Sequence, residues 1–188
     1  MERMVKFCVL KMIDKSIIVE QQRAVITYGL DLLFSSSINI LTILFFSLII
    51  GKERGIILLL LISIPLQSFG GGYHSETHLM CWILTTGGYL VALFGAVHLP
   101  VGVLLCTAFV SAYPFLWLSP VENPKAPFGE IFKEKMKKIV RKTYFWGIII
   151  SLILLVFGNE GARFVLAGIS LEGFSVYGAK CKRKRKLK

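Results

Sequence analysis

The run LDLLFSSSINILTILFFSLII, residues 30–50, decides the class of fold that this chain adopts. It is mostly apolar and long enough to supply the ~20 residues that a helix needs to cross the hydrocarbon core of a bilayer. A charged turn, Gly51-Lys52-Glu53-Arg54, ends it. Further apolar runs follow at 55–69, 80–97, 99–118, 144–157 and 162–177. We therefore expect an all-α, polytopic membrane protein with about six transmembrane helices, forming one integral-membrane domain over residues 1–188.

Basic residues are gathered in three regions of the chain. A cytoplasmic or interfacial arm at 1–24, a basic loop at 119–143 and a basic tail at 179–188 hold 19 of the 22 lysines and arginines. Lysine and arginine near membrane spans collect on the cytoplasmic side. Six spans place all three regions on that side, whereas five spans would put the tail opposite the central loop. We therefore expect both termini in the cytoplasm.

The net charge of +11 follows from this topology and requires no nucleic acid partner. The basic tail resembles a nucleic-acid patch when it is considered alone. In a polytopic chain such a tail is more often a topology anchor that contacts anionic membrane lipid, at about 1 kcal/mol per basic residue near the surface. We therefore expect membrane lipid, and not nucleic acid, as the partner of the tail.

The segment GGGYHSETHLMC, residues 70–81, places a candidate general base and a candidate nucleophile side by side at the start of the third expected span. A thiolate is a nucleophile, and an imidazole activates it and later protonates the leaving group. His78 and Cys81 are three residues apart and would be neighbours on a helix. His74 lies seven residues before Cys81, ~10 Å away along a straight helix. Helical spacing alone therefore slightly favours His78.

His74 can reach Cys81 only if the chain bends back before the third span. The three consecutive glycines at 70–72 permit such a bend, because glycine tolerates positive φ and close backbone approach. We therefore expect a re-entrant or bent Gly-rich segment there. A buried structural role is the alternative for Cys81.

Two other functions fit the same residues. His74, His78 and Cys81, with Glu76, could hold zinc and make a metal-dependent membrane hydrolase or transporter. The sequence lacks a second motif of acidic ligands, so we expect no metal and no cofactor. A non-catalytic peptide exporter or scaffold is the other alternative.

The pattern Gly71-Gly72-Tyr73-His74, six further residues and Cys81 resembles the signature of the accessory gene regulator B (AgrB) family. The Pro- and Lys-rich stretch Ser119–Pro127 resembles the loop of that family. Members of this family are membrane cysteine endopeptidases of quorum sensing in Gram-positive bacteria. The resemblance implies His74 as catalytic base and Cys81 as nucleophile, at the cytoplasmic face of a multi-pass protein of the cell membrane.

The resemblance also implies a substrate, a short propeptide of the AgrD type. Cys81 would attack the carbonyl at the end of the peptide core, and the acidic tail would leave as an amine protonated by His74. The core would remain as an acyl-thioester on Cys81 until an internal cysteine or serine displaced it, giving a thiolactone or lactone autoinducing peptide. A homodimer is also implied.

This chain departs from the family in one respect. Gln67 and Ser68 occupy the stretch where the family usually has an arginine. If that arginine steers the acidic tail of the propeptide in other members, the candidates for this role here are Lys133, Lys137, Lys138 and Arg141. The alternative for each of these basic residues is that its charge only sets the orientation of the chain in the membrane.

Three acidic residues complete the set of candidates. Glu76 could orient His74 as the third member of a triad. The alternative is that Glu76 is a solvated loop residue without a catalytic role. Asp31 and Glu172 fall near the cytoplasmic ends of the first and sixth expected spans. We expect both of these carboxylates to reach the membrane interface.

Overall fold

The computed structural model describes residues 2–72, 78–121 and 129–186. Every regular secondary-structure element within these residues is a helix. The α-helices are α1 (Glu2–Asp14), α2 (Arg23–Ile50), α3 (Glu53–Gly70), α4 (His78–His98), α5 (Val101–Val110), α6 (Glu130–Val156) and α7 (Gly161–Lys186). A short 3-10 turn, η1 (Glu20–Gln22), precedes α2, and a π-helical turn, η2 (Pro114–Leu118), follows α5. The all-α class expected from the sequence is confirmed.

Five helical segments of the described chain are long and apolar enough to cross a membrane. They are 29–50, 53–70, 79–98, 101–118 and 130–156. Their outward side chains are apolar too: Phe45, Val91 and Val156 are 61%, 73% and 85% exposed. A soluble protein rarely leaves large apolar areas uncovered, whereas lipid covers them in a membrane protein. The polytopic membrane fold is therefore confirmed, while the count of six spans and the cytoplasmic termini stay predictions.

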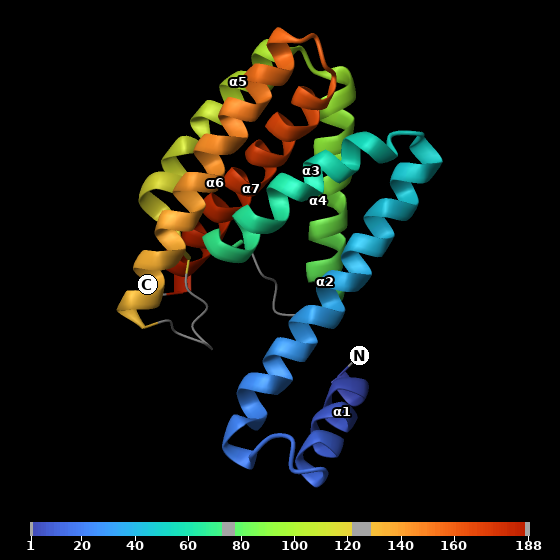
Figure 1. Cartoon of the computed structure of the whole chain (residues 1–188), viewed down its shortest axis with the longest axis vertical. Coiled ribbons are helices and arrows are strands. Elements are labelled where there is room, and N and C mark those ends of the chain that lie inside the picture. Colours follow the sequence, from blue (N-terminus) through green and yellow to red (C-terminus); the bar gives the residue numbers. More distant parts are fainter. Residues whose placement is uncertain (1, 73–77, 122–128, 187–188) are drawn as a thin grey trace.

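Helix α7 is the centre of the bundle, and α3, α4, α5 and α6 pack around it (Figure 1). It begins beside the end of α4, where the guanidinium of Arg163 donates hydrogen bonds to the carbonyls of Ala96 and Leu99. The two helices are therefore antiparallel. Most residues of the first half of α7 are buried, whereas Phe174 and Tyr177 nearer its C-terminus are exposed.

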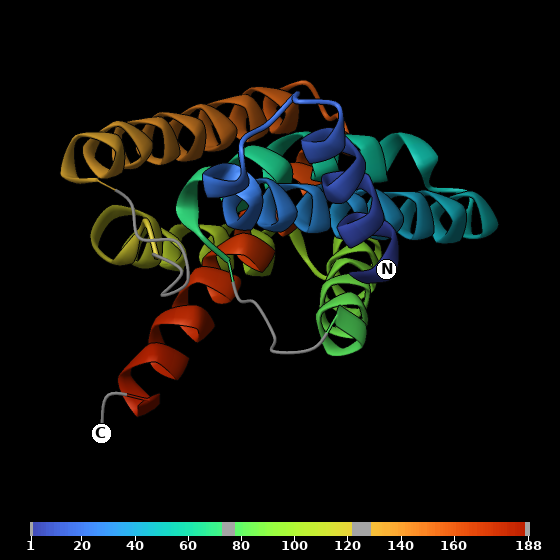
Figure 2. The ribbon, with the colours of Figure 1, turned by 90° about the horizontal axis from the view of Figure 1, so that it is seen from below.

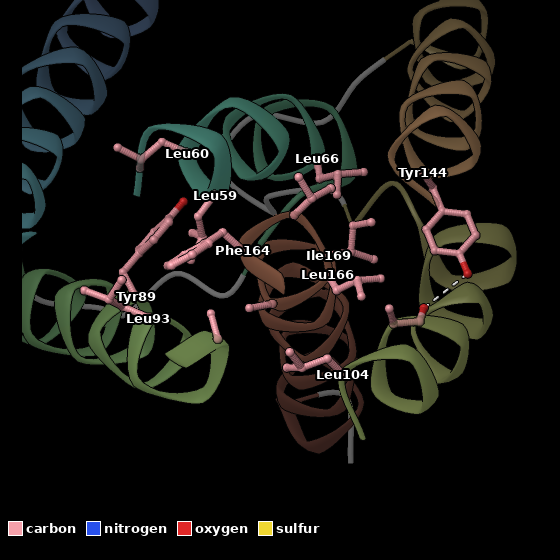
Figure 3. Packing of buried hydrophobic residues seen from close by; sticks show 14 of the residues in the cluster. Leu59, Leu60, Leu66, Tyr89, Leu93, Leu104, Tyr144, Phe164, Leu166 and Ile169 are labelled. Atoms are coloured by element: carbon pink, nitrogen blue, oxygen red, sulfur yellow. Dashed lines mark hydrogen bonds between the residues drawn. The ribbon is translucent and has the colours of Figure 1, made fainter. Parts of the chain in front are cut away.

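The core is built from apolar side chains that α7 shares with its neighbours (Figure 3). Phe164, Leu166 and Ile169 of α7 lie in the middle of this cluster. At one side of it, the Tyr144 hydroxyl of α6 donates a hydrogen bond of 3.2 Å to the Ala108 carbonyl of α5.

Small residues at intervals of seven let α3 approach α7 closely. Gly161, Gly168 and Ser175 share one face of α7, since seven residues make about two helical turns. A Cβ on Gly168 would lie 2.7 Å from the Ile62 side chain and 3.0 Å from the Leu59 carbonyl oxygen. Such close backbone approach through small residues is how helices associate in membranes.

Helix α6 begins well before its apolar part. Residues 130–143, expected in the basic loop, form the first turns of this helix, and the basic tail continues α7 as far as Lys186. Lysine and glutamate favour helix, so a spanning helix can extend beyond the apolar run that marks it in the sequence. Hydropathy locates the membrane-crossing part and not the helix ends.

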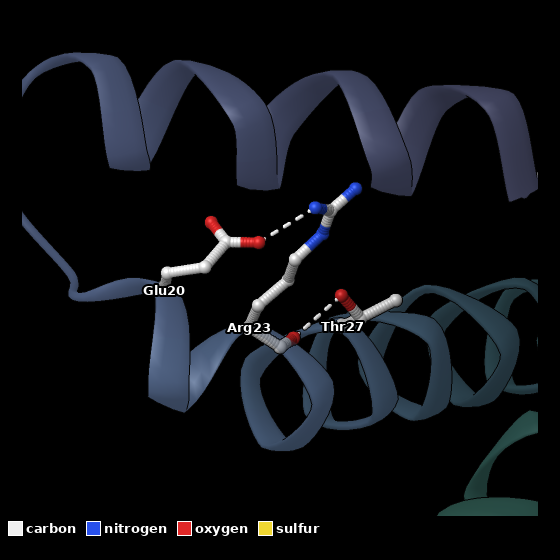
Figure 4. Close-up of polar contacts among 3 residues, drawn as sticks. All are labelled: Glu20, Arg23 and Thr27. Atoms are coloured by element: carbon white, nitrogen blue, oxygen red, sulfur yellow. Dashed lines mark hydrogen bonds and ion pairs between the residues drawn. The ribbon is translucent and has the colours of Figure 1, made fainter.

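Helix α1 packs along the first part of α2 as a separate unit, apart from the main bundle (Figure 1). Val5, Val9 and Ile18 are buried there. At the start of α2, Arg23 forms an ion pair of 2.7 Å with Glu20, and the Thr27 hydroxyl donates to the Arg23 carbonyl (Figure 4). The N-terminal arm is thus an ordered helical hairpin.

Candidate functional site

Several helix ends meet at one end of the bundle. Helix α3 and η2 finish there, α4 and α6 begin there, and α7 reaches its C-terminal part there (Figure 1). Figure 2 views the molecule from this end. The Gly-rich segment, Cys81 and the basic first turns of α6 therefore lie toward the same end of the protein.

Cys81 lies in the first turn of α4 as a half-buried, reduced thiol. Gly88 follows it by seven residues, and a Cβ on Gly88 would lie 3.1 Å from the Leu171 side chain of α7. Since residues seven apart share a helix face, Cys81 is on the side of α4 that faces α7. The neighbouring Trp82 fixes the rotation of this turn, because its indole N–H donates to the Thr42 hydroxyl of α2 at 3.4 Å.

The histidine that should act with Cys81 is not placed by the structure. His74 and Glu76 lie outside the described residues, and His78 is the first residue of α4. The contact between imidazole and thiol therefore stays a prediction. The described residues define the two ends of the intervening segment, at Gly72 and at His78.

The glycines leave α3 in a tight turn. Gly70 ends the helix, and Gly71 has a φ of +73°, in the region that favours glycine. A Cβ on Gly71 would collide with the carbonyl oxygen of Val121. Gly72 is buried, and a Cβ there would lie 3.0 Å from the Ser175 hydroxyl of α7. The chain thus turns at Gly71, while the bend back toward Cys81 that the sequence predicts involves residues outside the described ones and stays a prediction.

A segment distant in sequence holds this turn. The Ser119 hydroxyl donates a hydrogen bond of 3.0 Å to the Gly70 carbonyl, and the Val121 N–H donates one of 2.9 Å to the same oxygen. We call Ser119, Pro120 and Val121 the latch segment. These residues belong to the stretch that resembles the family loop, and the sequence alone predicted no contact for them. Their positions after a membrane span were the only signal available.

The four basic candidates on α6 differ in their surroundings. Lys138 is exposed, Lys133 and Lys137 are half-buried, and Lys133 lies 3.8 Å from the Glu130 carboxylate. Arg141 is different, because its guanidinium donates a hydrogen bond of 2.7 Å to the Leu116 carbonyl of η2. Arg141 therefore ties α6 to the end of η2, whereas the three lysines lie on the first turns of α6.

The expectation that Glu172 reaches the membrane interface is wrong. Its side chain is only 1% exposed, and the Tyr89 hydroxyl of α4 donates a hydrogen bond to its Oε1. Because α7 is the central helix, its neighbours surround this carboxyl and prevent it from extending outward. Asp31 on α2 is half-buried.

The metal alternative receives no support from the described part of the chain. Within residues 2–72, 78–121 and 129–186, no group of three His, Cys, Asp or Glu side chains could hold a metal ion. The set built on His74, His78 and Cys81 falls partly outside those residues.

Comparison with known proteins gives one match. A family model described as accessory gene regulator B matches residues 5–176. No curated protein and no solved structure matches the chain. The family match spans every apolar segment, the Gly-rich turn, Cys81 and the latch segment.

Proposed function

Since this chain belongs to the accessory gene regulator B family, we propose that it is a membrane-embedded cysteine endopeptidase. Membership of the family makes it a membrane protein of quorum sensing that takes part in processing a propeptide of the AgrD type. The proposal adds the chemistry: Cys81 cleaves the C-terminal tail from the propeptide, and the core then cyclises to a thiolactone or lactone.

The observation that carries the proposal is the position of Cys81. Its half-buried thiol occupies the first turn of α4, next to the Gly-rich turn in sequence. The backbone N–H groups of a first helical turn lack intrahelical partners and favour negative charge. A thiolate at this position, and the oxyanion formed after its attack, would both be stabilised by those groups.

In the proposed reaction, His74 takes the proton of the Cys81 thiol, and the thiolate adds to the scissile carbonyl. The tetrahedral intermediate collapses, the C–N bond breaks, and His74 gives its proton to the leaving amine of the tail. The core remains joined to Cys81 through a thioester. An internal thiol or hydroxyl of the core then attacks this thioester, which releases the ring and returns the thiol of Cys81.

The acyl-thioester must survive until the internal nucleophile arrives, so water must be kept away from it. Leu79 and Met80, beside Cys81, are exposed apolar side chains on a helix of membrane-spanning composition. Lipid around these side chains would keep the site dry. The same surroundings suit a substrate that approaches along the membrane surface.

Three lysines support the proposed recognition of an acidic tail. Lys133, Lys137 and Lys138 lie on the first turns of α6, toward the same end of the bundle as Cys81. They replace the arginine that the family usually has before its glycine pair. Attraction between exposed charges is screened by salt, so this role makes processing sensitive to ionic strength.

The proposal is tested by co-expression with the cognate propeptide and detection of the released tail and the cyclic product. Cys81→Ala should abolish both products, and His74→Ala should lower their rate by about 10²–10⁴-fold. Cys106→Ala, which removes an exposed thiol from α5, is the matched control and should retain the wild-type rate. Full processing by the Cys81→Ala variant would refute the proposal.

Inhibitors separate this chemistry from the metal alternative. In a variant that keeps Cys81 as its only cysteine, an alkylating agent should stop processing and EDTA should not. The opposite result would favour a metal site. Loss of activity in His78→Ala, but not in His74→Ala, would assign the base to the helical neighbour of Cys81.

A further inference from the structure

We propose that Ser119 is a positioning residue: with the Val121 N–H, it holds the Gly70 carbonyl and so sets the direction in which the chain leaves α3, on which the proposed action of His74 on Cys81 depends. This inference rests on the proposed function of His74 and Cys81. It assigns a role to the latch segment, which otherwise only joins η2 to the residues before α6.

Two hydrogen bonds meet at one atom, the carbonyl oxygen of Gly70. A carbonyl in the last turn of a helix has no intrahelical partner. The Gly70 carbonyl instead receives two donors, the Ser119 hydroxyl at 3.0 Å and the Val121 N–H at 2.9 Å. Both donors come from a segment 49 residues or more further along the chain. The end of α3 is thus fixed by a distant part of the protein.

The latch segment also fits closely against the following residue, Gly71. Gly71 turns the chain with a φ of +73°. The Val121 carbonyl oxygen occupies the space that a Cβ on Gly71 would need. The latch segment therefore contacts the turn on two successive residues, and it sets the direction in which the chain leaves the helix.

The latch segment is itself held in place by its neighbours. Arg141 donates to the Leu116 carbonyl at 2.7 Å, which ties the end of η2 to α6. Ser119 and Pro120 are buried, and a Cβ on Gly70 would lie 3.6 Å from Val176 and 3.8 Å from Val140. In such a dry junction a hydrogen bond is stronger than at a wet surface. The hold on Gly70 is therefore rigid.

A rigid hold matters because His74 follows Gly71 by only three residues. A proton is transferred only when base and thiol are within hydrogen-bond reach. An error of about 1 Å in the placement of a catalytic group can lower the rate by about 10²-fold. A change of direction at Gly71 would carry His74 with it. Ser119 contacts neither the substrate nor the reacting atoms, so it affects the rate only through the position that the chain direction at Gly71 gives to His74.

The test compares Ser119→Ala with Ser151→Ala. Ser151 is the matched control, because it is equally buried and its hydroxyl also makes one hydrogen bond, 2.8 Å to the Ile148 carbonyl within α6. Rates of tail release are measured on purified, folded protein in lipid vesicles of anionic composition with synthetic propeptide. Ser119→Ala should lower kcat by about 10-fold or more with little change in KM, and Ser151→Ala should change neither constant.

A second readout distinguishes positioning of His74 from a general loss of stability. Iodoacetamide alkylation of Cys81 is followed against pH in a variant whose other cysteines are alanine. Both Ser119→Ala and His74→Ala should slow alkylation near neutral pH, and Ser119→Ala should slow it less than His74→Ala. At high pH the thiol ionises without help, so both variants should react as fast as the parent. Ser119→Cys, with a weaker donor of similar size, should fall between serine and alanine in kcat.

The outcomes are separable. Equal kcat in Ser119→Ala and Ser151→Ala, with His74→Ala still inactive, would overturn the positioning role and leave the proposed function intact. Processing that survives both His74→Ala and Cys81→Ala would overturn the proposed function itself. If Ser119→Ala yields too little folded protein, the Ser119→Cys comparison decides alone: a kcat equal to that of the parent would overturn the role of the hydroxyl donor.

Discussion

The hydroxyl of Tyr89 lies 3.3 Å from Oε1 of Glu172 and donates a hydrogen bond to it inside the bundle, joining α4 to the central helix. The second carboxyl oxygen, Oε2, is also buried and has no hydrogen-bond partner among the described residues. A buried ionised carboxyl is costly unless it is paired. This contact is therefore a sensitive point of the fold.

We expect Tyr89→Phe to destabilise the protein by about 1–3 kcal/mol, because it leaves a buried polar group without its donor. Glu172→Gln should cost less, since an amide has the same shape, carries no charge and still accepts the hydrogen bond from Tyr89. Thermal unfolding of the detergent-solubilised protein measures both. A larger drop in apparent melting temperature for Glu172→Gln than for Tyr89→Phe would contradict this account.

Gly71→Ala should impair both folding and processing. A positive φ costs of order 1–3 kcal/mol for a residue with a Cβ, and the new methyl group would also collide with the Val121 carbonyl oxygen. Gly102→Ala is the control, because nothing lies within 4 Å of a Cβ at that helical position. Gly102→Ala should stabilise the helix by up to about 1 kcal/mol. Equal melting temperatures for the two variants would show that the turn is not strained by a side chain.

Arg163→Ala should loosen the junction of α4 and α7. The guanidinium donates at 2.6 Å to the Ala96 carbonyl and at 2.7 Å to the Leu99 carbonyl, both at the end of α4. Hydrogen bonds to charged groups contribute about 1.5–3 kcal/mol each. We expect a clear loss of thermal stability, partly restored in Arg163→Lys, whereas the exposed Arg54→Ala should melt like the parent. Indistinguishable melting of Arg163→Ala and Arg54→Ala would refute this role.

Replacing Lys133, Lys137 and Lys138 together by glutamine should raise the KM for the propeptide and leave kcat nearly unchanged. The physical reason is loss of attraction for the acidic tail, and the salt dependence of KM should become shallower with it. The control replaces the three lysines of the N-terminal arm, Lys6, Lys11 and Lys15. An unchanged salt dependence in the α6 variant would assign these lysines to membrane topology alone.

The helical spans could be predicted from the sequence because apolar runs of bilayer length have few other structures available. The first turns of α6 could not, since the lysines of residues 133–142 are typical both of a cytoplasmic loop and of a solvated helix. The central place of α7 was also missed. The prediction that Glu172 reaches the interface assumed that this helix faces lipid, whereas its side chain is buried in the bundle.

The residue types of the candidate site could be predicted from the sequence, but the contacts that hold them in place could not. Glycines followed by histidine and cysteine indicate a bend and a nucleophile, and the structure has a turn at Gly71. The hold of Ser119 on Gly70 joins residues 49 positions apart. No local pattern encodes such a contact, because it depends on how η2, α6 and α7 pack around the end of α3.

The central claim is that Cys81 becomes acylated by the propeptide core, and mass spectrometry of the trapped intermediate tests it most directly. A propeptide whose internal cysteine or serine is replaced by alanine cannot cyclise, so the acyl-enzyme should accumulate. We predict a mass increase equal to that of the core on the peptide containing Cys81, absent in Cys81→Ala and strongly reduced in His74→Ala. Release of the tail without any adduct on Cys81, or an adduct on Cys106 or Cys181 instead, would contradict the account.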